Sequence, residues 1–453
     1  MSNRRCHNAI NLVSVDGVSV EGVQNIRAAV FGHYSTHFKS LGVDRPGVDG
    51  LHFRKLSYAK AGNLTKSFSL NEVKQKVLDC DNFKSPRLDD ISFGFIKFFW
   101  ELLKDDFMRF LVEFHRNRKL TKGLNSTFIA LIPKVNSPQR FNDFRPISLV
   151  GCMYKVLAKV LANRLRNVIG SVVSDSESAF VKGKQILDGI LIGNEEVDEA
   201  RRMNKELLMF KVDFEKAYDS MDLKYLDSVM VNMNFPTICR KWISECVGTT
   251  TTSVLVNGCP TEEFPIEQGL RQGDPLSPFL FLLDAEGFNV LMNTVMGVHL
   301  FHGYGVGRVG EVRLTHLQFA DDTLIIGEKS WLNVRSMREM LLLFEEVSVL
   351  KVNFHKSMLT GVNISEFWLS KAVLVMNFRR GTIPFVYLGL PIDGDSRKLR
   401  FWKPIVDRIV ARLSSWNSKF LSFGGRLVLL KSVMSSLPVY FLSFFKAPAG
   451  KCS

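Results

Sequence analysis

Two adjacent acids, Asp321 and Asp322, constrain this chain more than any other feature, because they lie between two apolar strands predicted over residues 311–319 and 323–326. Acids are common at hairpin tips, so a solvated turn is the ordinary explanation for such a pair taken alone. Against an apolar sheet, however, two ionised carboxylates repel each other, and a cation would offset that cost. The pair is therefore a candidate metal site.

A third acid, Asp213, ends the apolar run over residues 207–212, far upstream of the pair. Only tertiary structure can unite these acids, for example on neighbouring strands that carry them at matching ends. Carboxylates are hard oxygen ligands suited to Mg²⁺, with phosphate and water completing the shell. Two such ions about 4 Å apart can activate an attacking oxygen and stabilise a leaving one in phosphoryl transfer.

Composition and charge narrow the class of protein. The 453 residues include 59 Lys+Arg and 45 Asp+Glu, a net charge of +14, which favours nucleic acid or an anionic membrane surface as partner. A hydrophobic share of 46% and a charged share of 23% argue against disorder. No run reaches the ~18 uninterrupted apolar residues that span a bilayer, and no secretory signal is visible, so we expect no membrane partner. The seven scattered Cys form no C-x-x-C pair, which argues against a zinc site.

Hydrophobic periodicity predicts strands and helices that interleave without regular βαβ spacing, so we predict an α+β fold. Ser69 and Glu72 have the spacing of a capping box. On the helix predicted over 154–169, Arg164 falls on the polar face. Residues 1–66 show no clear period, and we expect a loosely structured lead-in. Further strands are predicted over 126–133, 207–212 and 253–257, and further helices over 91–116, 279–295, 331–349, 400–416 and 426–437.

Several motifs in order resemble the reverse transcriptases of long interspersed elements, that is, non-LTR retrotransposons, most like those of plants. The run from Phe319 to Asp322 resembles the catalytic acid pair of that family, and the run from Phe210 to Asp219 resembles its first acid motif. The resemblance is collinear from about residue 67 to residue 448. It implies a right-hand polymerase with helical fingers over 67–205, an antiparallel-sheet palm over 206–395 and a partial helical thumb over 396–453. The implied catalytic residues, which are also the implied metal ligands, are Asp213, Asp321 and Asp322.

The resemblance also implies where the nucleotide binds. In the motif over 269–278, glycines beside Gln272 permit a close backbone approach, and Gln272 would lie beside the incoming nucleotide. Lys134 and Arg145, in motifs that resemble the fingers, would bind the triphosphate. Taken singly, each of these cations is more usually a solvated surface charge. The implied nucleotide-binding set is Lys134, Arg145, Phe214, Tyr218, Gln272 and Lys356.

Two members of this set leave alternatives open. Tyr218 would crowd the 2′ position of the sugar, although a buried core tyrosine explains it equally well and both can hold. In the motif over 350–356 one lysine could protonate the pyrophosphate leaving group, and the sequence does not choose between Lys351 and Lys356.

Other residues invite simpler explanations. Asp219 is expected to be structural, for example as a cap, and His316 is expected to be a packed or edge residue. Residues 305–310 match G-x-G-x-x-G, but a strand follows them where a dinucleotide site needs a helix, so we predict a hairpin connection. Residues 385–392 resemble the motif that grips the primer end, and an ordinary hairpin explains them equally well.

The function implied is an RNA-directed DNA polymerase that extends a primer 3′-OH with deoxynucleotides. Its cofactors would be two Mg²⁺ ions, with Mn²⁺ as a substitute. The implied partners are an RNA template, a DNA primer and deoxynucleoside triphosphates, and the implied location is the nucleus or cytoplasm.

Two alternatives remain. One alternative is a decayed retrotransposon fragment that only binds nucleic acid. Two features favour it: the ends of the chain, which we infer to be short relative to the family, and the loop in which Arg87, Leu88 and Asp90 replace the family's Gly, Pro and Gly. A maturase of the group II intron type shares the palm, but it requires an RNA-binding region after the thumb.

Overall fold

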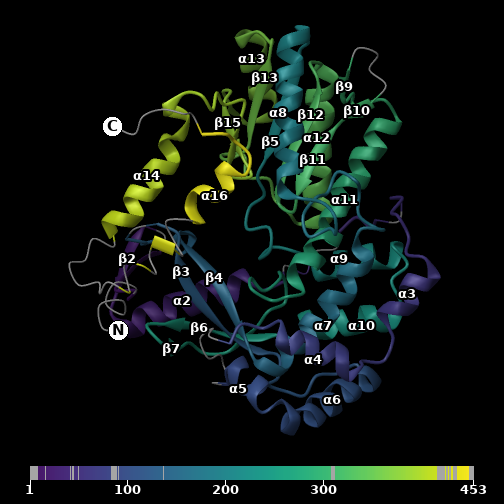
Figure 1. The fold of residues 1–453 in the computed structure, drawn as a ribbon, viewed down its shortest axis with the longest axis vertical. Helices are drawn as coiled ribbons and strands as arrows, with labels where there is room; N and C mark the ends of the chain where they lie inside the picture. The colour runs from purple at the N-terminus through teal and green to yellow at the C-terminus, as the bar shows by residue number, and fades with distance from the viewer. Residues whose placement is uncertain are drawn as a thin grey trace.

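A computed structural model describes residues 9–415 except positions 16, 41, 43–44, 49, 83–88, 90, 136 and 308–311, and then positions 424, 427, 430–431 and 436–447. Two five-stranded sheets and the helices around them form the fold (Figure 1). The predicted α+β class is confirmed. The altered loop of residues 84–90, apart from Asp89, and most of the helix predicted over 426–437 lie outside the described residues.

The first sheet has the strand order β11-β12-β5-β13-β14, with β5 antiparallel to both of its neighbours. Leu207 and Met209 of β5 point into one hydrophobic cluster, whereas Leu208, Phe210 and Val212 point into another. Both faces of β5 are therefore covered, which explains why its sequence is almost continuously apolar rather than alternating. The strands are β5 (Leu207–Val212), β11 (His316–Phe319), β12 (Asp322–Glu328), β13 (Met358–Val362) and β14 (Arg379–Arg380).

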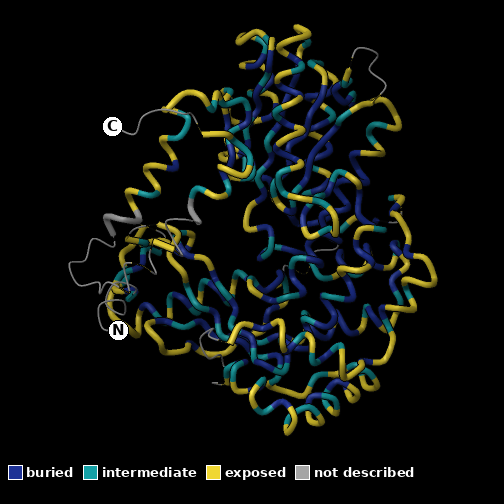
Figure 2. Tube along the Cα trace, in the orientation of Figure 1, coloured by how far each residue is buried: buried dark blue, intermediate teal, exposed yellow. Residues whose placement is uncertain are grey.

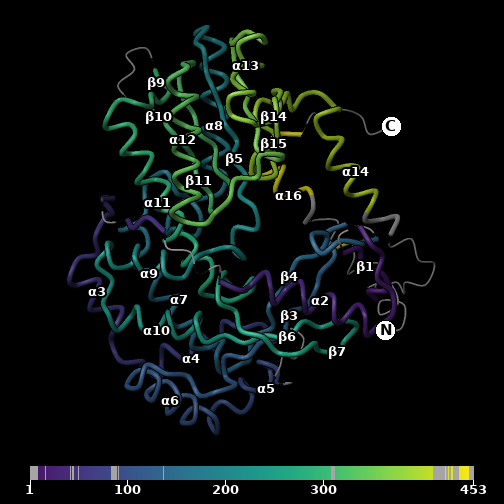
Figure 3. The backbone as a smooth tube through the Cα atoms, turned by 180° about the vertical axis from the view of Figure 1, so that it is seen from behind, coloured from purple at the N-terminus to yellow at the C-terminus, as the bar shows by residue number. Residues whose placement is uncertain are grey.

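Helices cover both faces of this sheet (Figures 1 and 3). One face packs on α11 (Ser277–Gly297) and α12 (Trp331–Ser348), and the other on α8 (Ile186–Met203) and the hairpin of β15 (Phe385–Tyr387) and β16 (Leu390–Ile392). Among the described helices only α11 is long and apolar enough to cross a bilayer, but 78% of its apolar window is buried inside the protein. In Figure 2, α11 and the sheet are largely in the dark blue of buried residues, as expected of a central core.

The second sheet joins chain segments from two of the predicted domains. β3 pairs antiparallel with β4 and parallel with β6, although β6 falls within the range that we assigned to the palm. Helix α2 packs on β6. The strands are β3 (Ser126–Pro133), β4 (Phe144–Val150), β6 (Thr251–Val256), β7 (Cys259–Pro260) and β8 (Phe264–Pro265).

The remaining helices mostly agree with the predicted periodicity. Ser69 caps α4 by accepting a hydrogen bond from the Glu72 backbone N–H, but the Glu72 carboxylate pairs with Arg164 and does not complete the predicted capping box. The glycine motif at 305 begins in β9, which pairs with β10, so the predicted hairpin is confirmed. The elements are α4 (Leu70–Leu78), α5 (Phe93–Phe98), α6 (Trp100–Asn117), α7 (Cys152–Ile169), α9 (Leu223–Asn232), α10 (Thr237–Gly248), α13 (Glu366–Met376), α14 (Leu399–Ser415), α16 (Ser436–Leu442), β9 (Tyr304–Val306) and β10 (Val312–Leu314).

The expectation of a loose lead-in is wrong for most of residues 9–66. This segment forms β1 (Leu12–Val15), β2 (Val18–Glu21), α2 (Val23–His37) and α3 (Tyr58–Leu64). Ile26, Val30 and Tyr34 of α2 are buried against the second sheet. The helix starts at Gly22 without a side-chain cap, so the sequence carries no start signal there.

The prediction that Arg164 lies on the polar face of α7 is also wrong, because this side chain is buried. Its Nε and Nη2 donate to Oε1 and Oε2 of Glu72, both at 2.9 Å, and its guanidinium lies 4.5 Å from the Phe68 ring centroid. It also donates to the carbonyl oxygens of residues 64, 66 and 67. This one side chain therefore ties α7 to α4 and to the segment before α4.

We expect Arg164→Ala to lower the free energy of unfolding by about 3 kcal/mol, because it leaves Glu72 and several buried carbonyl groups without a donor. The matched control is Arg166→Ala on the exposed side of the same helix, which should cost less than about 1 kcal/mol. Urea unfolding of both variants measures the difference. Equal losses would show that Arg164 contributes no more than a surface arginine.

Candidate active site

The three predicted acids lie at one end of the first sheet. Asp213 directly follows β5, and Asp321 lies in the two-residue turn between β11 and β12. Thr323 of β12 is opposite Val212 of β5, so the next step along both strands leads to Asp322 and Asp213. Asp213 therefore follows β5 and Asp322 begins its antiparallel neighbour β12, so the acids lie at the same end of the sheet.

Burial and mutual repulsion both raise the pKa values of Asp321 and Asp322. Partial desolvation, and then the negative charge of Asp213, raises the pKa of Asp321 above its ordinary value. Burial, and then the charges of Asp321 and Asp213, raises the pKa of Asp322, while Lys211 acts in the opposite direction. Each carboxylate thus lies in the field of another, which is the condition that a bound cation would relieve.

The donor chemistry of this group suits a hard divalent cation, because all three side chains are carboxylates. Among the residues that the structure describes, however, no group of three His, Cys, Asp or Glu side chains is gathered into a complete ligand set. The carboxylates share the sheet end without converging on one point. Phosphate and water oxygens would have to supply part of any metal shell here.

The segment over 350–356 lies beside Asp213. The Asn353 N–H donates to the Asp213 carbonyl at 2.7 Å, and the Asp213 N–H donates to Ser357 Oγ at 3.0 Å. Lys356 Nζ is 3.7 Å from Asp213 Oδ2, whereas the charge of Lys351 acts on Glu345. The sequence did not choose between Lys351 and Lys356 as the proton donor, and of these two Lys356 lies beside the acids.

The loop that carries Gln272 is fixed by a close backbone approach. Gly269 has φ +84°, and a Cβ there would lie 2.3 Å from the Asp219 carbonyl oxygen, so this position requires glycine. Gln272 Nε2 donates to Asp219 Oδ1 at 3.0 Å, and the Gln272 carbonyl accepts from the Ser148 N–H at 2.8 Å. The loop therefore bridges the second sheet and the acid motif.

Several residues have roles that differ from the expectation. Asp219 is not a cap; Asp222 caps α9 instead, and Asp219 accepts the bond from Gln272. Arg271 is buried, forms an ion pair with Asp274 at 2.6 Å and therefore supports the loop from inside.

Two aromatic residues of the predicted nucleotide set lie in different surroundings. Tyr218 is half-buried, and its ring stacks on Phe281 with centroids 4.7 Å apart. Burial, and then the negative charge of Asp321, raises the pKa of the Tyr218 hydroxyl. The Phe214 ring is buried and packs edge-on against Phe344, which leaves it in the core rather than on the site surface.

Among the cations of the second sheet, Lys134 lies in the electrostatic field of Lys356, the lysine beside Asp213. Lys134 and Arg145 are exposed, at the end of β3 and the start of β4, and Lys134 Nζ donates to the Asn142 carbonyl at 3.0 Å. Burial lowers the pKa of Lys134, and the positive charges of Arg145, Lys356 and Lys216 lower it further. Cations from both sheets therefore share one field, as an anion-binding surface requires.

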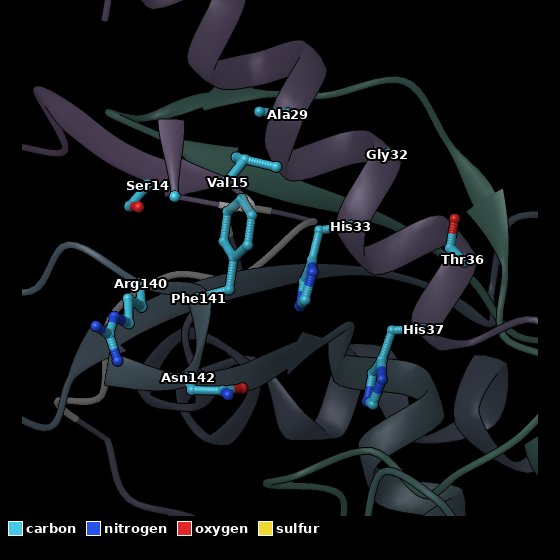
Figure 4. Close-up of a pocket in the computed structure, with 11 residues that line it drawn as sticks. Ser14, Val15, Ala29, Gly32, His33, Thr36, His37, Arg140, Phe141 and Asn142 are labelled. Atoms are coloured by element: carbon cyan, nitrogen blue, oxygen red, sulfur yellow. The ribbon is translucent and has the colours of Figure 1, made fainter. Parts of the chain in front are cut away.

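A hollow of about 870 Å³ lies near this surface, in the segment that was expected to be loose (Figure 4). His33 stacks on Phe141 at 4.2 Å and lies parallel to His37 at 6.1 Å between centroids. Burial, and then the charge of Lys216, lowers the pKa of both histidines to about 4, so both are neutral at pH 7. No local sequence pattern distinguishes these histidines, because they come together with Phe141 only through folding. The hollow is lined by Ser14, Val15, Gly17, Ala29, Gly32, His33, Thr36, His37, Arg140, Phe141 and Asn142.

The buried Asp219 generates a pH prediction. Burial raises its pKa from 3.8 to about 6, so the folded protein holds this proton more tightly than the unfolded chain does. The proton's stabilising effect is complete below about pH 4 and is lost as the pH rises through 6. Asp219→Asn keeps an acceptor oxygen and carries no charge. We expect it to match the native protein at pH 4 and to exceed its stability at pH 8 by up to about 3 kcal/mol.

Urea unfolding at pH 4, 6 and 8 checks this prediction. The control, Asp143→Asn, should behave oppositely, because backbone N–H groups of Arg140 and Gln139 lower the pKa of Asp143. It should lose stability relative to the native protein as the pH rises. A constant difference for Asp219→Asn at all three pH values would contradict the account of that residue.

Comparisons with known proteins agree with this geometry. A family model described as "Reverse transcriptase (RNA-dependent DNA polymerase)" matches residues 132–392, more than half of the chain. A Xenopus laevis protein described as "Transposon TX1 uncharacterized 149 kDa protein" is 25% identical over 435 residues, which cover 94% of this chain and 32% of that protein. A Popillia japonica Pol polyprotein from the type-1 retrotransposable element R2 is 27% identical over 43% of this chain and 26% of its own length.

Among solved structures, a telomerase from Candida albicans in complex with a fragment of telomeric RNA aligns with a TM-score of 0.40 and 12% identity, over 79% of this chain and 60% of that chain. The chain spans about a third or less of the length of these two retrotransposon relatives. The family model covers β5, the acid turn and the loop of Gln272 together. This chain belongs to the reverse transcriptase family.

Proposed function

We propose that this chain is an RNA-directed DNA polymerase, which extends a primer 3′-OH with deoxynucleotides copied from an RNA template. The observation that carries the proposal is the meeting of Asp213, Asp321 and Asp322 at one sheet end, with Lys356 beside Asp213 and Lys134 of the second sheet in the field of Lys356. Carboxylates beside cations suit a reaction on a triphosphate, in which metal ions and basic side chains share the negative charge.

Asp213, Asp321 and Asp322 would hold the metal ions, which we propose to be two Mg²⁺ with Mn²⁺ as a substitute. When bound, divalent ions of this kind activate an attacking hydroxyl and offset the charge of a leaving pyrophosphate. The raised pKa values of Asp321 and Asp322 support this assignment, because burial and then repulsion from the neighbouring acids cause them, and a bound cation would offset both.

The other side chains of the site would bind and orient the nucleotide. Lys134 and Arg145 project from the strand ends of the second sheet and would bind the triphosphate oxygens. Gln272, held by Asp219, would border the base pair, and Tyr218 would lie against the sugar. Lys356, beside Asp213, would donate a proton to the leaving pyrophosphate. Phe214 would contribute packing behind Asp213, not a ligand contact.

The proposal also assigns parts of the fold to the subdomains of a right-hand polymerase. The first sheet would be the palm, the second sheet with the helices of residues 67–205 the fingers, and α14 with α16 part of the thumb. Template and primer would be bound through their phosphates, so that affinity falls steeply with salt. The assignment to a plant element, and to the nucleus or cytoplasm, rests on the sequence motifs.

Primer extension tests the proposal. Purified chain should extend oligo(dT) on poly(rA) with dTTP and Mg²⁺, and Asp321→Asn should reduce the rate at least about 10³-fold while still binding the duplex, because it removes a metal ligand and no cation. The matched control is Asp198→Asn, which changes an exposed acid of α8 and should retain full activity.

No extension by the native chain, with salt-dependent duplex binding intact, would overturn the proposed activity. That result would instead favour a decayed fragment that retains only nucleic-acid binding. Extension that Asp321→Asn leaves unchanged would overturn the assignment of the site.

The choice between the two lysines gives a separate prediction. Lys356→Ala should lower kcat about 10²-fold at saturating nucleotide, because the leaving group loses its proton donor. Lys351→Ala is the control, with a lysine of the same segment that acts on Glu345 instead. A loss in Lys351→Ala as large as in Lys356→Ala would contradict the assignment.

A further inference from the structure

A buried glutamate outside the proposed catalytic set lies directly behind the acid turn. Glu177 is 1% exposed and belongs to the segment between α7 and α8. This segment runs parallel to β11, where the Gln318 N–H donates to the Ser176 carbonyl and the Ser178 N–H donates to the Gln318 carbonyl, both at 3.0 Å. Glu177 is thus held beside the strand that leads into Asp321.

The carboxylate of Glu177 bonds to the backbone on both sides of this contact. Its Oε1 accepts from the Ala179 N–H at 2.6 Å and from the Ala320 N–H at 3.3 Å. Ala320 is buried and immediately precedes Asp321. The acceptor of the Ala320 N–H is therefore the side chain of Glu177, which is 143 positions away in the sequence.

The turn at Ala320 needs such support. Its φ is +53°, in the left-handed region that favours glycine, and it lies in a two-residue loop closed by the pairing of Phe319 with Asp322. In such a loop the first N–H takes no part in the strand ladder. Without an acceptor from elsewhere, this buried donor would be unpaired.

Other buried side chains hold the same turn. Gln318 Nε2 donates to the Ala320 carbonyl at 3.3 Å, so both polar groups of the Ala320 backbone have side-chain partners. From the β15–β16 hairpin, the Tyr387 hydroxyl donates to the Leu317 carbonyl at 3.3 Å and the Asp322 carbonyl at 3.4 Å. The peptide units around the acids are thus fixed by groups that do not themselves reach the site surface.

We propose that Glu177 is a positioning residue, which through the Ala320 N–H fixes the turn that aims Asp321 and Asp322 at a divalent cation. The inference rests on the proposed function of these two acids as metal ligands. Groups behind metal ligands commonly change metal affinity 10- to 100-fold when they are removed. Burial also raises the pKa of Glu177 to about 7, so a neutral glutamine is a fair substitute for it.

Mn²⁺ binding, followed by electron paramagnetic resonance of the full chain, tests the inference without requiring activity. Glu177→Met keeps the volume and removes the acceptor, and we expect about tenfold weaker Mn²⁺ binding. Glu177→Gln keeps an acceptor oxygen and should bind within about twofold of the native chain. In primer extension, the same variants should show the same order in kcat, with the KM for nucleotide nearly unchanged.

The matched control is Glu286→Met, which changes another buried glutamate. Glu286 accepts from the Ser174 N–H at 2.9 Å and from Asn289 Nδ2 at 2.8 Å, and no hydrogen bond in the described residues joins it to the acid turn. This variant should lose thermal stability and keep its Mn²⁺ affinity. Gln318→Met removes the second support of Ala320 and should weaken Mn²⁺ binding as Glu177→Met does, which gives an independent test if Glu177→Met does not fold.

Native Mn²⁺ affinity in Glu177→Met, equal losses in Glu286→Met, or a loss in Glu177→Gln as large as in Glu177→Met would each overturn the positioning role. A native chain that binds no Mn²⁺ would overturn it as well. If the native chain extends no primer but Mn²⁺ binding follows the expected order, the proposed polymerase activity fails and the positioning role stands.

Discussion

The pairing register of β5 with β12 is the constraint on which the proposed site depends. With Thr323 opposite Val212, the two strands deliver Asp213 and Asp322 to the same end of the sheet. A shift of one residue would turn every side chain of a strand to the opposite face. Because both faces of this sheet are buried in separate hydrophobic clusters, such a shift would bury the wrong side chains, and the packing therefore fixes where the acids lie.

That register gathers negative charge, and much of the surrounding structure is arranged to tolerate it. Lys356 lies beside Asp213, and Lys211 acts on Asp322. Behind the turn, Glu177 and Gln318 pair the backbone of Ala320, whose left-handed conformation costs about 1 kcal/mol or more in a residue other than glycine. Fold stability and site geometry are thus coupled at a single two-residue turn.

The sequence was sufficient for features that local pattern or an ordered set of motifs determines. The apolar run of β5 and the capped start of α4 follow from periodicity and residue type, and the ordered motifs single out the three acids. The sequence was insufficient where a side chain pairs with a residue that is distant along the chain. Arg164 pairs with Glu72, 92 positions away, and nothing in the helix pattern distinguishes it from the lysines beside it.

Asp219 and the N-terminal segment are two further features that local sequence could not predict. A buried acid that accepts from Gln272 and a solvated turn acid have the same local sequence, so only the close approach at Gly269 separates them. Strands of four residues and an uncapped helix, as in β1, β2 and α2, carry almost no local signal and are stabilised by packing on the second sheet.

Asp213, Asp321 and Asp322 would together hold divalent cations next to a bound nucleotide. Anomalous diffraction can locate these ions in crystals of the chain with primer–template, a non-hydrolysable deoxynucleotide and Mn²⁺. We expect two anomalous peaks between these three carboxylates and the triphosphate, with Lys134 and Arg145 on the phosphate oxygens. A nucleotide bound elsewhere, or Mn²⁺ peaks that do not contact Asp213 and Asp321, would contradict this assignment.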